Sequence, residues 1–561
     1  MTRNVQTRRL QRENARPAFR FRNLVEQCCL YATVLLWLAA CAHAQTGPYR
    51  VAGTVVNSIT AQPVSGAMVA LLSIQDSSTF AATESGPDGH FEFVNLPAAS
   101  FQLTASRRGY CTGFFNQHQD YNSAVVTGEG QDTASLLFKL APEAVLSGTV
   151  TADTGDPVEG ATVMLFEKPQ GHDPGARVQL AGTATTDDTG AYEFPDLAAG
   201  EYLLAVRAQP WYAMSQFSTT LERQPESEQQ AALDVAYPLT FFDSTTDQSS
   251  ATPIVLASGS REQANLNLHA VPALHIQVQS PRRADGSIVQ PELRQTVFGL
   301  DVAGGGALIS RSRDGSTEFS GVAPGQYELT QGDPPRIVDL DATASQQVDP
   351  AAGTPAFAVS GTLQPTPGTT LSGAAILTLE PAAGDADSLP PPAFANQRAF
   401  AFAAVPAGAW RLHVSNGLDV VSIAADGHTQ PGNLLTVQDH ALNLAVTVSA
   451  GRAVRVEGVA QKGNKPFAGA MVVLVPKNLK AMAELARRDQ SNSDGSFALL
   501  DVEPGDYTVV AIEDGWDVDW GNPSVIARYL PAGQTVTVKD SPDSQPGRRI
   551  TLPGPVAVQP R

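Results

Sequence analysis

The sequence predicts an all-β protein, built as a tandem array of β-sandwich domains behind an N-terminal signal segment. Two recurring patterns and the composition predict this class. A β-hairpin pattern occurs five times, and a pair of strands separated by a Gly-Ala bend precedes four of the five hairpins. The 47 glycines and 40 prolines among 561 residues agree with a chain of short strands and frequent turns.

The hairpin is clearest at residues 493–509. An Asp-Gly pair opens it and favours a tight turn, because glycine accepts a positive φ at little steric cost. Phe497 and Leu499 then alternate with small or polar residues, which is the period of a half-buried strand. A Pro-Gly pair predicts a second turn, with Gly505 in the left-handed position of a type II turn. Tyr507 resumes the alternation in the second strand.

Copies of both patterns recur at about the length of a domain, which indicates separate domains rather than a solenoid. The hairpin copies lie at residues 89–103, 190–204, 315–329, 400–412 and 495–509. The paired strands lie at residues 51–71, 146–165, 359–377 and 456–474. We therefore expect a signal peptide at 1–44, sandwiches 1 to 5 at 45–141, 142–270, 271–350, 351–450 and 451–555, and a tail at 556–561.

The combined pattern G-x-V, P-V-x-G-A-x-V and D-G-x-F-x-F-x-x-L-x-P-G-x-Y-x-L resembles the carboxypeptidase regulatory-like domain. The resemblance implies a transthyretin-like, seven-stranded, Ig-like sandwich grouped with the carbohydrate-binding-like folds. It is strong in domains 1, 2 and 5, and it makes domains 3 and 4 degenerate copies; in domain 3 only the second half is clear. Its motif consists mostly of core and turn residues, so it identifies a fold rather than an activity.

The first 44 residues have the features of an export signal. Seven arginines lie before an apolar stretch at 28–40, which is too short for a comfortable membrane span. Ala42-His43-Ala44 forms an A-x-A cleavage site. Leu-Ala-Ala-Cys ending at Cys41 also resembles a bacterial lipobox, in which Cys41 would carry a lipid. The two interpretations exclude each other, and we favour cleavage after Ala44, which predicts a protein in the periplasm, on the outer surface or secreted.

The net charge, the hydropathy and the cysteine content exclude several classes of partner and of covalent structure. The net charge is −19, which disfavours nucleic acid because nucleic-acid binding needs basic patches. No segment after the signal has the apolar length of a membrane span. Cys111 is the one cysteine outside the leader, so a disulfide framework is not expected, and we predict a partly buried, unreactive thiol there.

Catalytic and metal motifs are missing from the sequence. None of the nine histidines is followed three residues later by Glu, so the zinc ligands of a carboxypeptidase are lacking. G-x-S-x-G and P-loop motifs are also lacking. Acidic runs at 187–190 and 514–519 do not have EF-hand spacing, and we interpret them as turns. We therefore predict no catalytic residue, no metal site and no cofactor.

Aromatic residues give the best candidates for ligand contact. Trp211, Tyr212, Trp516 and Trp520 follow the last hairpin strand of their domains, near Asp and Gln. Aromatic rings beside amides and carboxylates suit carbohydrate, because a ring packs on the C–H face of a sugar. The alternative is that these rings fold back onto their own sandwich, as large aromatics usually do. Trp410 occupies the Tyr507 position of the hairpin, so we expect it in the core.

These observations predict a non-catalytic binding or scaffold protein of the bacterial cell envelope, with polysaccharide or envelope proteins as partners. The resemblance to carbohydrate-binding-like folds makes carbohydrate the favoured ligand. A structural spacer or adhesin stalk, and an accessory subunit of an envelope enzyme or transporter, are the alternatives. An enzyme would need an acid–base pair that converges in a cleft.

Overall fold

The structure is a computed structural model. It describes residues 47–74, 78–169, 177–213, 232–280, 288–303, 308–311, 316–349, 351–367, 369, 371, 375–382, 389–390, 392, 393–396, 398–415, 418–450, 454–539 and 548–561. The predicted signal peptide at 1–44 and the lipidation candidate Cys41 lie outside the described residues. The described part is almost entirely β-structure, in agreement with the predicted fold class.

Domains 1 and 2 are sandwiches of two sheets. Domain 1 contains β1 Tyr49–Asn57, β2 Met68–Ser73, β3 Thr79–Glu84, β4 His90–Leu96, β5 Ser100–Arg107, β6 Tyr110–Phe114, β7 Val125–Val126 and β8 Leu136–Leu140. Domain 2 contains β9 Ala144–Ala152, β10 Thr162–Glu167, β11 Gln179–Thr185, β12 Ala191–Leu197, β13 Gly200–Arg207, β14 Val235–Ala236, β15 Thr240–Phe241, η2 Gln248–Ser250, β16 Ile254–Leu256, β17 Arg261–Gln263 and β18 Leu266–Leu268. Each encloses its own apolar core between its sheets.

Domains 3 and 4 share one continuous sheet, because β26 pairs with the start of β28. Domain 3 contains β19 Val271–Pro272, β20 Leu274–Gln279, β21 Glu292–Val297, β22 Leu300–Ala303, β23 Leu308–Arg311, β24 Ser316–Val322, β25 Gly325–Gln331, β26 Arg336–Ala342 and β27 Gln346–Val348. Domain 4 contains β28 Thr354–Pro365, β29 Ala375–Pro381, β30 Ala393–Ala395, β31 Ala399–Pro406, β32 Gly408–Val414, β33 Leu418–Ala425, β34 His428–Pro431, β35 Leu434–Val437 and β36 Leu442–Ala450. Their cores remain separate.

Domain 5 completes the array and contains five short helical segments among its described residues. Its elements are β37 Val454–Lys462, β38 Lys465–Pro466, β39 Met471–Pro476, η3 Leu479–Ala481, α3 Met482–Leu485, β40 Arg487–Gln490, β41 Ser496–Val502, β42 Gly505–Ile512, η4 Gly515–Asp517, α4 Pro523–Ile526, η5 Leu530–Ala532, β43 Gln534–Val538, β44 Arg549–Thr551 and β45 Val556–Gln559. The predicted tail at 556–561 is wrong as a boundary: β45 pairs in parallel with β37 and β42, and Val556 is fully buried in the core.

All five domains have the same strand topology. The first strand pairs antiparallel with the first strand of the hairpin, as β1 does with β4 and β20 with β24. It also pairs in parallel with a late strand of its domain, as β1 does with β8 and β20 with β27. Domain 3, in which the sequence pattern is weakest, therefore has the same fold as the others. The late strand that pairs in parallel with the first strand completes each sandwich. Neither of the two recurring sequence patterns includes this strand.

The hairpins contain a shared irregularity. The first hairpin strand has a β-bulge against its partner, and Asp501 within the bulge of β41 has a φ of 54°. Asn95 and Asp196 occupy the same place with φ values of 60° and 58°. Short polar side chains tolerate this region better than most residues. The prediction that Gly505 takes the left-handed position is therefore wrong: Gly505 is the first residue of β42, and Asp501 adopts the positive φ.

The second hairpin strand is held to the turn by one hydrogen bond. The hydroxyls of Tyr202, Tyr327 and Tyr507 donate to the carbonyl four residues earlier, at 3.0, 2.8 and 2.9 Å. The indole of Trp410 makes the same bond at 2.9 Å. Trp410 is buried, as the repeat predicts. The aromatic of this motif therefore fills the core and also satisfies a turn carbonyl.

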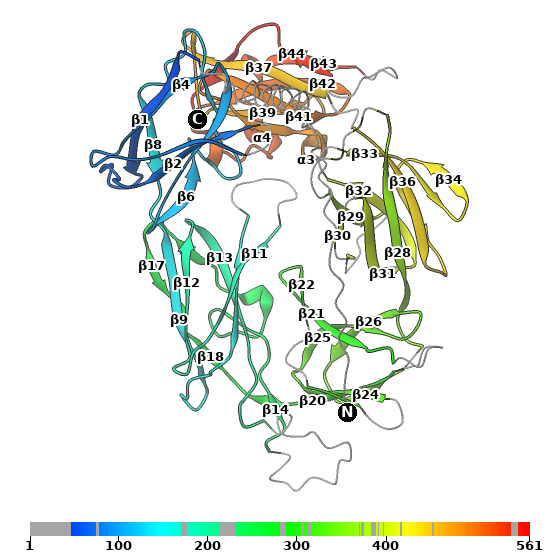
Figure 1. Cartoon of the computed structure of the whole chain (residues 1–561). Helices are drawn as coiled ribbons and strands as arrows, with labels where there is room; N and C mark the ends of the chain where they lie inside the picture. Colours follow the sequence, from blue (N-terminus) through cyan, green and yellow to red (C-terminus); the bar gives the residue numbers. More distant parts are fainter. Residues whose placement is uncertain are drawn as a thin grey trace, which may run out of the picture.

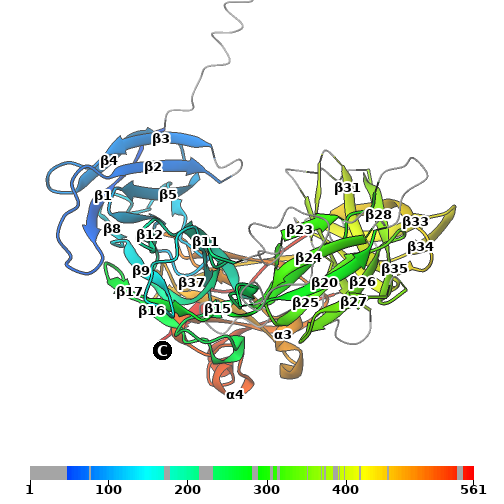
Figure 2. The same ribbon diagram turned by 90° about the horizontal axis from the view of Figure 1, so that it is seen from below.

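Five domains follow one another around a ring, shown in Figure 1. Domains 1 and 2 form one side and domains 3 and 4 the other, which Figure 2 shows from below. Domain 5 lies between domain 4 and domain 1 and contacts domain 1 directly. This contact between the first and last domains closes the ring.

Candidate functional site

Domains 1 and 5 meet through two short polar segments. The Ser123 hydroxyl donates to the carbonyl of Ser491 at 2.8 Å. The backbone N–H of Ser493 donates to the carbonyl of Ala124 at 2.9 Å. Ser123 and Ser491 are both fully buried. Because these buried polar groups find their partners across the junction, the contact specifies one docking geometry.

Gln490 lies at the centre of this junction and is 1% exposed. Its amide nitrogen donates to the carbonyl of Asn116 at 2.5 Å and to the hydroxyl of Ser123 at 2.9 Å. Its amide oxygen lies 3.0 Å from Nδ1 of His118. One side chain of domain 5 thus satisfies three groups of domain 1.

An aromatic cluster continues the junction. The ring of His118 stacks on Trp516 with centroids 5.1 Å apart and planes 5° apart, and Tyr121 packs on the same indole at 5.4 Å. The Arg488 guanidinium lies 5.1 Å from the Tyr121 ring centroid and 4.6 Å from that of Trp520. Cations placed over aromatic faces are stabilised by the ring quadrupole, more so when shielded from water.

The four aromatic candidates are therefore separated by the fold. Trp516 and Trp520 are 6% and 3% exposed, because they pack on the apolar residues of domain 5, and His118 and Tyr121 of domain 1 also cover Trp516. Trp211 is 72% exposed, and Tyr212 beside it is half-buried. The burial of Trp516 and Trp520 matches the alternative in which large aromatics fold back onto their own domain. In addition, a second domain covers Trp516. Ligand contact by any of the four stays a prediction.

A cavity of about 970 Å³ lies where domains 1, 2 and 5 meet. Domain 1 contributes Asn116 and Lys139, domain 2 contributes Lys168 and Gln179, and domain 5 contributes Arg488. Amides, hydroxyls and charges of both signs share the lining with two phenyl rings. Such a lining offers many hydrogen-bond donors and acceptors to a polar ligand, and the volume is large enough for a small molecule.

The joint between domains 1 and 2 contains Cys111. Its thiol donates to the carbonyl of Leu197 in domain 2 at 3.3 Å. Burial raises the pKa of the Cys111 thiol, and the nearby carboxylates of Glu143 and Asp196 raise it further. The thiol is therefore kept protonated and unreactive. The structure confirms the predicted partly buried cysteine and adds its place at an interdomain joint.

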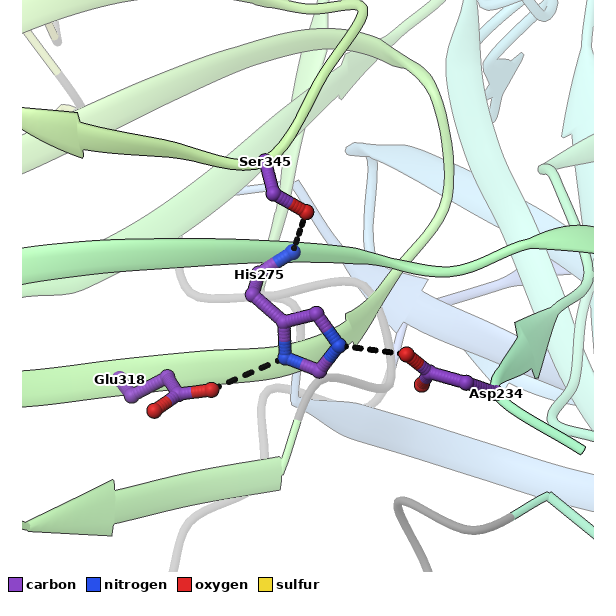
Figure 3. A network of polar contacts seen from close by, with 4 residues as sticks. All are labelled: Asp234, His275, Glu318 and Ser345. Carbon is purple, nitrogen blue, oxygen red and sulfur yellow. Dashed lines mark hydrogen bonds and ion pairs between the residues drawn. The ribbon is translucent and has the colours of Figure 1, made fainter. Parts of the chain in front are cut away.

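The joint between domains 2 and 3 contains a histidine between two carboxylates, shown in Figure 3. Nε2 of His275 lies 2.7 Å from Asp234 of domain 2, and Nδ1 lies 2.9 Å from Glu318 of domain 3. The backbone N–H of His275 also donates to the hydroxyl of Ser345 at 3.0 Å. Ionised carboxylates only accept hydrogen bonds. The two contacts are therefore both hydrogen bonds at the same time only when each ring nitrogen carries a proton.

The acidic run at 187–190 builds a turn, as predicted. Asp187 accepts hydrogen bonds from the backbone N–H groups of Thr189 and Ala191, both at 2.9 Å. The hydroxyl of Thr189 also bonds to this carboxylate, and these bonds lower the pKa of Asp187. Within the described residues, no three His, Cys, Asp or Glu side chains are grouped to hold a metal ion. The helices that the structure describes are too short and polar to cross a membrane.

The junction residues were missed by sequence reasoning. Gln490, Ser123 and His118 belong to polar stretches, and His275 alternates with apolar residues in β20; none of them is part of a catalytic or metal motif. Their partners lie in other domains, and a polar stretch does not show which distant segment covers it. Polar residues between strands are ordinarily turns or solvent-exposed loops.

The shared topology defines a class of protein with tandem β-sandwich domains. Residues 50–135 and 145–234 match the family model of the carboxypeptidase regulatory-like domain. These segments cover the sandwich of domain 1 and the greater part of that of domain 2, so the chain contains two carboxypeptidase regulatory-like domains, as the motif suggested for these two; the resemblance of domain 5 stays a prediction. No curated protein is similar enough to the chain to count as a match.

Several solved structures show a distant likeness. A streptococcal ancillary pilin is 12% identical over 54% of this chain and 98% of its own, with a TM-score of 0.18. The minor pilin GBS52 of Streptococcus agalactiae is 12% identical over 40% and 97%, with a TM-score of 0.19. The shaft pilin SpaA of Lactobacillus rhamnosus GG is 11% identical over 40% and 98%, with a TM-score of 0.18. At these TM-scores the likeness supports no conclusion about function.

Proposed function

We propose that this protein is a non-catalytic scaffold exported to the bacterial cell envelope, and that carbohydrate is its ligand. The observation that supports the proposal best is the cavity of about 970 Å³ at the junction of domains 1, 2 and 5. A scaffold of five sandwiches closed into a ring holds three domains around one polar cavity. The predicted signal peptide at 1–44 supports export.

The chemistry of the lining suits a saccharide. Gln117, Gln119 and Gln179 bring amide groups to the cavity, and Phe114 and Phe467 bring phenyl rings. Amides both donate and accept hydrogen bonds, as sugar hydroxyls do. Phenyl rings provide apolar surface for the C–H faces of a sugar. A ligand with alternating hydroxyl and C–H surface matches both features at once.

The closed ring distinguishes this proposal from an extended stalk. A stalk keeps its first and last domains apart, whereas here His118 of domain 1 stacks on Trp516 of domain 5. Small-angle X-ray scattering of the exported chain would report a ring as a compact particle. A particle with the length of five sandwiches end to end would favour the spacer or adhesin stalk instead.

Ligand binding can be tested with a bulky substitution on β11 that fills part of the cavity. Gln179 in β11 lines the cavity, whereas the exposed Thr183 on the same strand does not. We expect saturable binding of one polysaccharide from a soluble panel, abolished by Gln179→Trp and unchanged by Thr183→Trp. The proposal fails if no glycan binds the wild-type chain, or if both variants bind as the wild type does.

A further inference from the structure

One wall of the cavity of about 970 Å³ is a short segment of domain 1 that domain 5 holds in place. Residues 116–119 follow β6, and all four line the cavity. The side chain of Gln490 donates to the carbonyl of Asn116 at 2.5 Å, and its amide oxygen lies 3.0 Å from Nδ1 of His118. Arg488 donates to Oε1 of Gln119 at 3.3 Å. Domain 5 therefore contacts three of the four residues of this wall.

The backbone of the wall segment has a conformation that needs support. Asn116 and Gln119 have φ values of 51° and 54°, in the left-handed region. Asparagine visits this region readily, but glutamine does so uncommonly. Within domain 1, His118 and Tyr121 exchange backbone hydrogen bonds at 2.8 and 3.0 Å, which closes the turn over Gln119. Uncommon conformations persist where surrounding contacts hold them, and here Gln490 and Arg488 of domain 5 supply side-chain contacts.

The rest of the lining comes from domains that lie together only while the ring is closed. Domain 5 contributes Phe467 and Arg488, and domain 2 contributes Gln179 on the other side. A molecule that fills the cavity therefore touches both domains. The lining has charges of both signs, from Lys139, Lys168, Arg177 and Arg488 and from Asp120, Glu167 and Asp514. Gln490 is 1% exposed and is not among the described residues that line the cavity.

We propose that the carbohydrate site is complete only in the closed ring, and that Gln490 is a positioning residue that holds residues 116–119 in the binding shape. An open junction leaves this wall without its partners and separates Phe467 from domain 2. Binding and ring closure favour each other, because coupling between two equilibria is reciprocal. The measured affinity is then the affinity of the closed ring reduced by the fraction of rings that are closed. The inference rests on the proposed carbohydrate function and adds the regulation of its site.

The first test compares two buried glutamines in the full exported chain. Titration calorimetry uses maltotetraose, cellotetraose, chitotetraose and tetragalacturonate, because the lining has charges of both signs; a polysaccharide that binds the wild type is the probe if none of these does. Gln490→Ala should weaken binding at least about fivefold, the lower end of typical coupling between two sites. The control Gln331→Ala removes an equally buried amide in domain 3, which donates to the carbonyl of Asp349 at 2.9 Å. It should lower the thermal midpoint and leave the affinity unchanged.

The second test uses the wild type, so it does not depend on how a variant folds. The N–H of Ser493 donates to the carbonyl of Ala124 at 2.9 Å, and the N–H of Val126 donates to the hydroxyl of Ser493 at 2.8 Å. Both bonds cross the junction, so the bound saccharide should slow amide hydrogen exchange at Ser493 and Val126 and leave β25 of domain 3 unchanged.

Two results would overturn this inference and leave the proposed function standing. One is a saccharide that binds the wild type and Gln490→Ala equally. The other is a saccharide that binds the wild type without slowing exchange at Ser493 and Val126. If no tetrasaccharide and no polysaccharide binds the wild type, the proposed function falls as well.

Discussion

The imidazole of His118 lies parallel to the indole of Trp516, with ring centroids 5.1 Å apart and an interplanar angle of 5°. His118 follows β6 of domain 1, and Trp516 follows β42 of domain 5. Both loops come after the hairpin of their sandwich, so equivalent loops of the first and last domains pack on each other. This contact covers Trp516, one of the four aromatic residues that the sequence offers for ligand contact, and it closes the ring.

Gln490→Ala should open the ring. The substitution removes the bonds to Asn116, Ser123 and His118, and leaves these groups of domain 1 without that partner in the junction. Each buried polar group left unsatisfied costs about 1–3 kcal/mol. We expect a larger radius of gyration by small-angle X-ray scattering, with domain 5 still folded by circular dichroism.

The control for this variant is Gln326→Ala, which changes an exposed glutamine on β25 of domain 3. It should leave the radius of gyration unchanged. If Gln490→Ala scatters like the wild type, then the junction does not depend on the buried amide, and the aromatic cluster and the remaining hydrogen bonds suffice to close the ring.

The hairpins could be predicted because their signals are local. Phe497 and Leu499 alternate with polar residues over one strand, and the structure places both in the core of domain 5. At residues 479–488 the helical spacing of Leu and Met predicts a helix, and the structure bears this out for the first part of the segment only. The structure has η3 and α3 there, but Arg487 and Arg488 begin β40, which pairs with β39. Pairing with a strand overrides a weak local preference.

The first strand of domain 3 lacks a glycine that the first strands of the other four domains have, and the structure explains why. In domains 1, 2, 4 and 5 a glycine on the first strand faces an aromatic of the hairpin, as Gly361 faces Phe400 and Gly458 faces Phe497. In domain 3 the equivalent pair is Val278 and Thr317, so a larger residue on one strand accompanies a smaller one on the other. The summed side-chain volume of the two facing residues is therefore similar in all five domains. The sequence of one strand alone does not reveal this compensation.

Contacts between domains could not be predicted. His275 reaches Asp234 of domain 2 and Glu318 of domain 3 because the two domains pack in one orientation. Sequence periodicity determines which face of a strand is buried, but it carries no information about which domains meet. The polar cavity at the junction of domains 1, 2 and 5 was missed for the same reason.

Stability should depend on pH through Asp489. Burial raises the pKa of its carboxyl to about 6 from an ordinary value of 3.8, against the opposing backbone hydrogen bonds. The folded state therefore binds a proton more tightly than the unfolded state. Stability from this group is present below about pH 4 and is lost as the pH rises to about 6. The full change is about 3 kcal/mol, from a difference of about two pKa units.

Asp489→Asn isolates this effect. Chemical denaturation at pH 4, 5, 6 and 7.5 should show that the free energy of unfolding of the wild type, relative to the variant, falls over this range. Asn loses one acceptor at every pH, which shifts the variant by a constant amount. The exposed Asp341→Asn in domain 3 serves as the control. A constant difference between wild type and Asp489→Asn would contradict the raised pKa.

In domain 1 a threonine hydroxyl makes the hydrogen bond that the hairpin tyrosine makes in domains 2, 3 and 5. Phe101 stands at the tyrosine position, and the carbonyl of Pro97, four residues earlier, accepts the hydroxyl of Thr127 at 2.6 Å. Thr127→Val should destabilise domain 1 by about 1–3 kcal/mol, because with little change in volume it removes this buried bond and also the hydroxyl oxygen that accepts the Ala99 N–H at 3.0 Å. Phe101→Tyr should recover part of that loss in the variant by supplying the hydroxyl, and should give no gain in the wild type. Thermal denaturation of the four proteins forms the cycle; equal effects of Phe101→Tyr in both backgrounds would disprove the exchange.

Gly458→Ala should show how tightly the first strand and the hairpin pack in domain 5. A Cβ at this position would lie 2.5 Å from Cζ of Phe497 and 3.0 Å from Cδ1 of Leu552, closer than side-chain carbons approach. Phe497 is 2% exposed in the core, so it cannot swing into solvent. Overpacking of this kind costs about 1–3 kcal/mol.

The matched partner of this variant is Gly458→Ala combined with Phe497→Leu. Phe497→Leu alone leaves a cavity in the core and destabilises the domain. In the double variant the added methyl fills part of the space that the phenyl ring vacates, as Val278 opposite Thr317 does in domain 3. The double variant should therefore be more stable than the sum of the two single effects allows, by urea denaturation followed by circular dichroism. Strict additivity would mean that the glycine and the ring do not share one volume, and that the missing glycine of domain 3 has another cause.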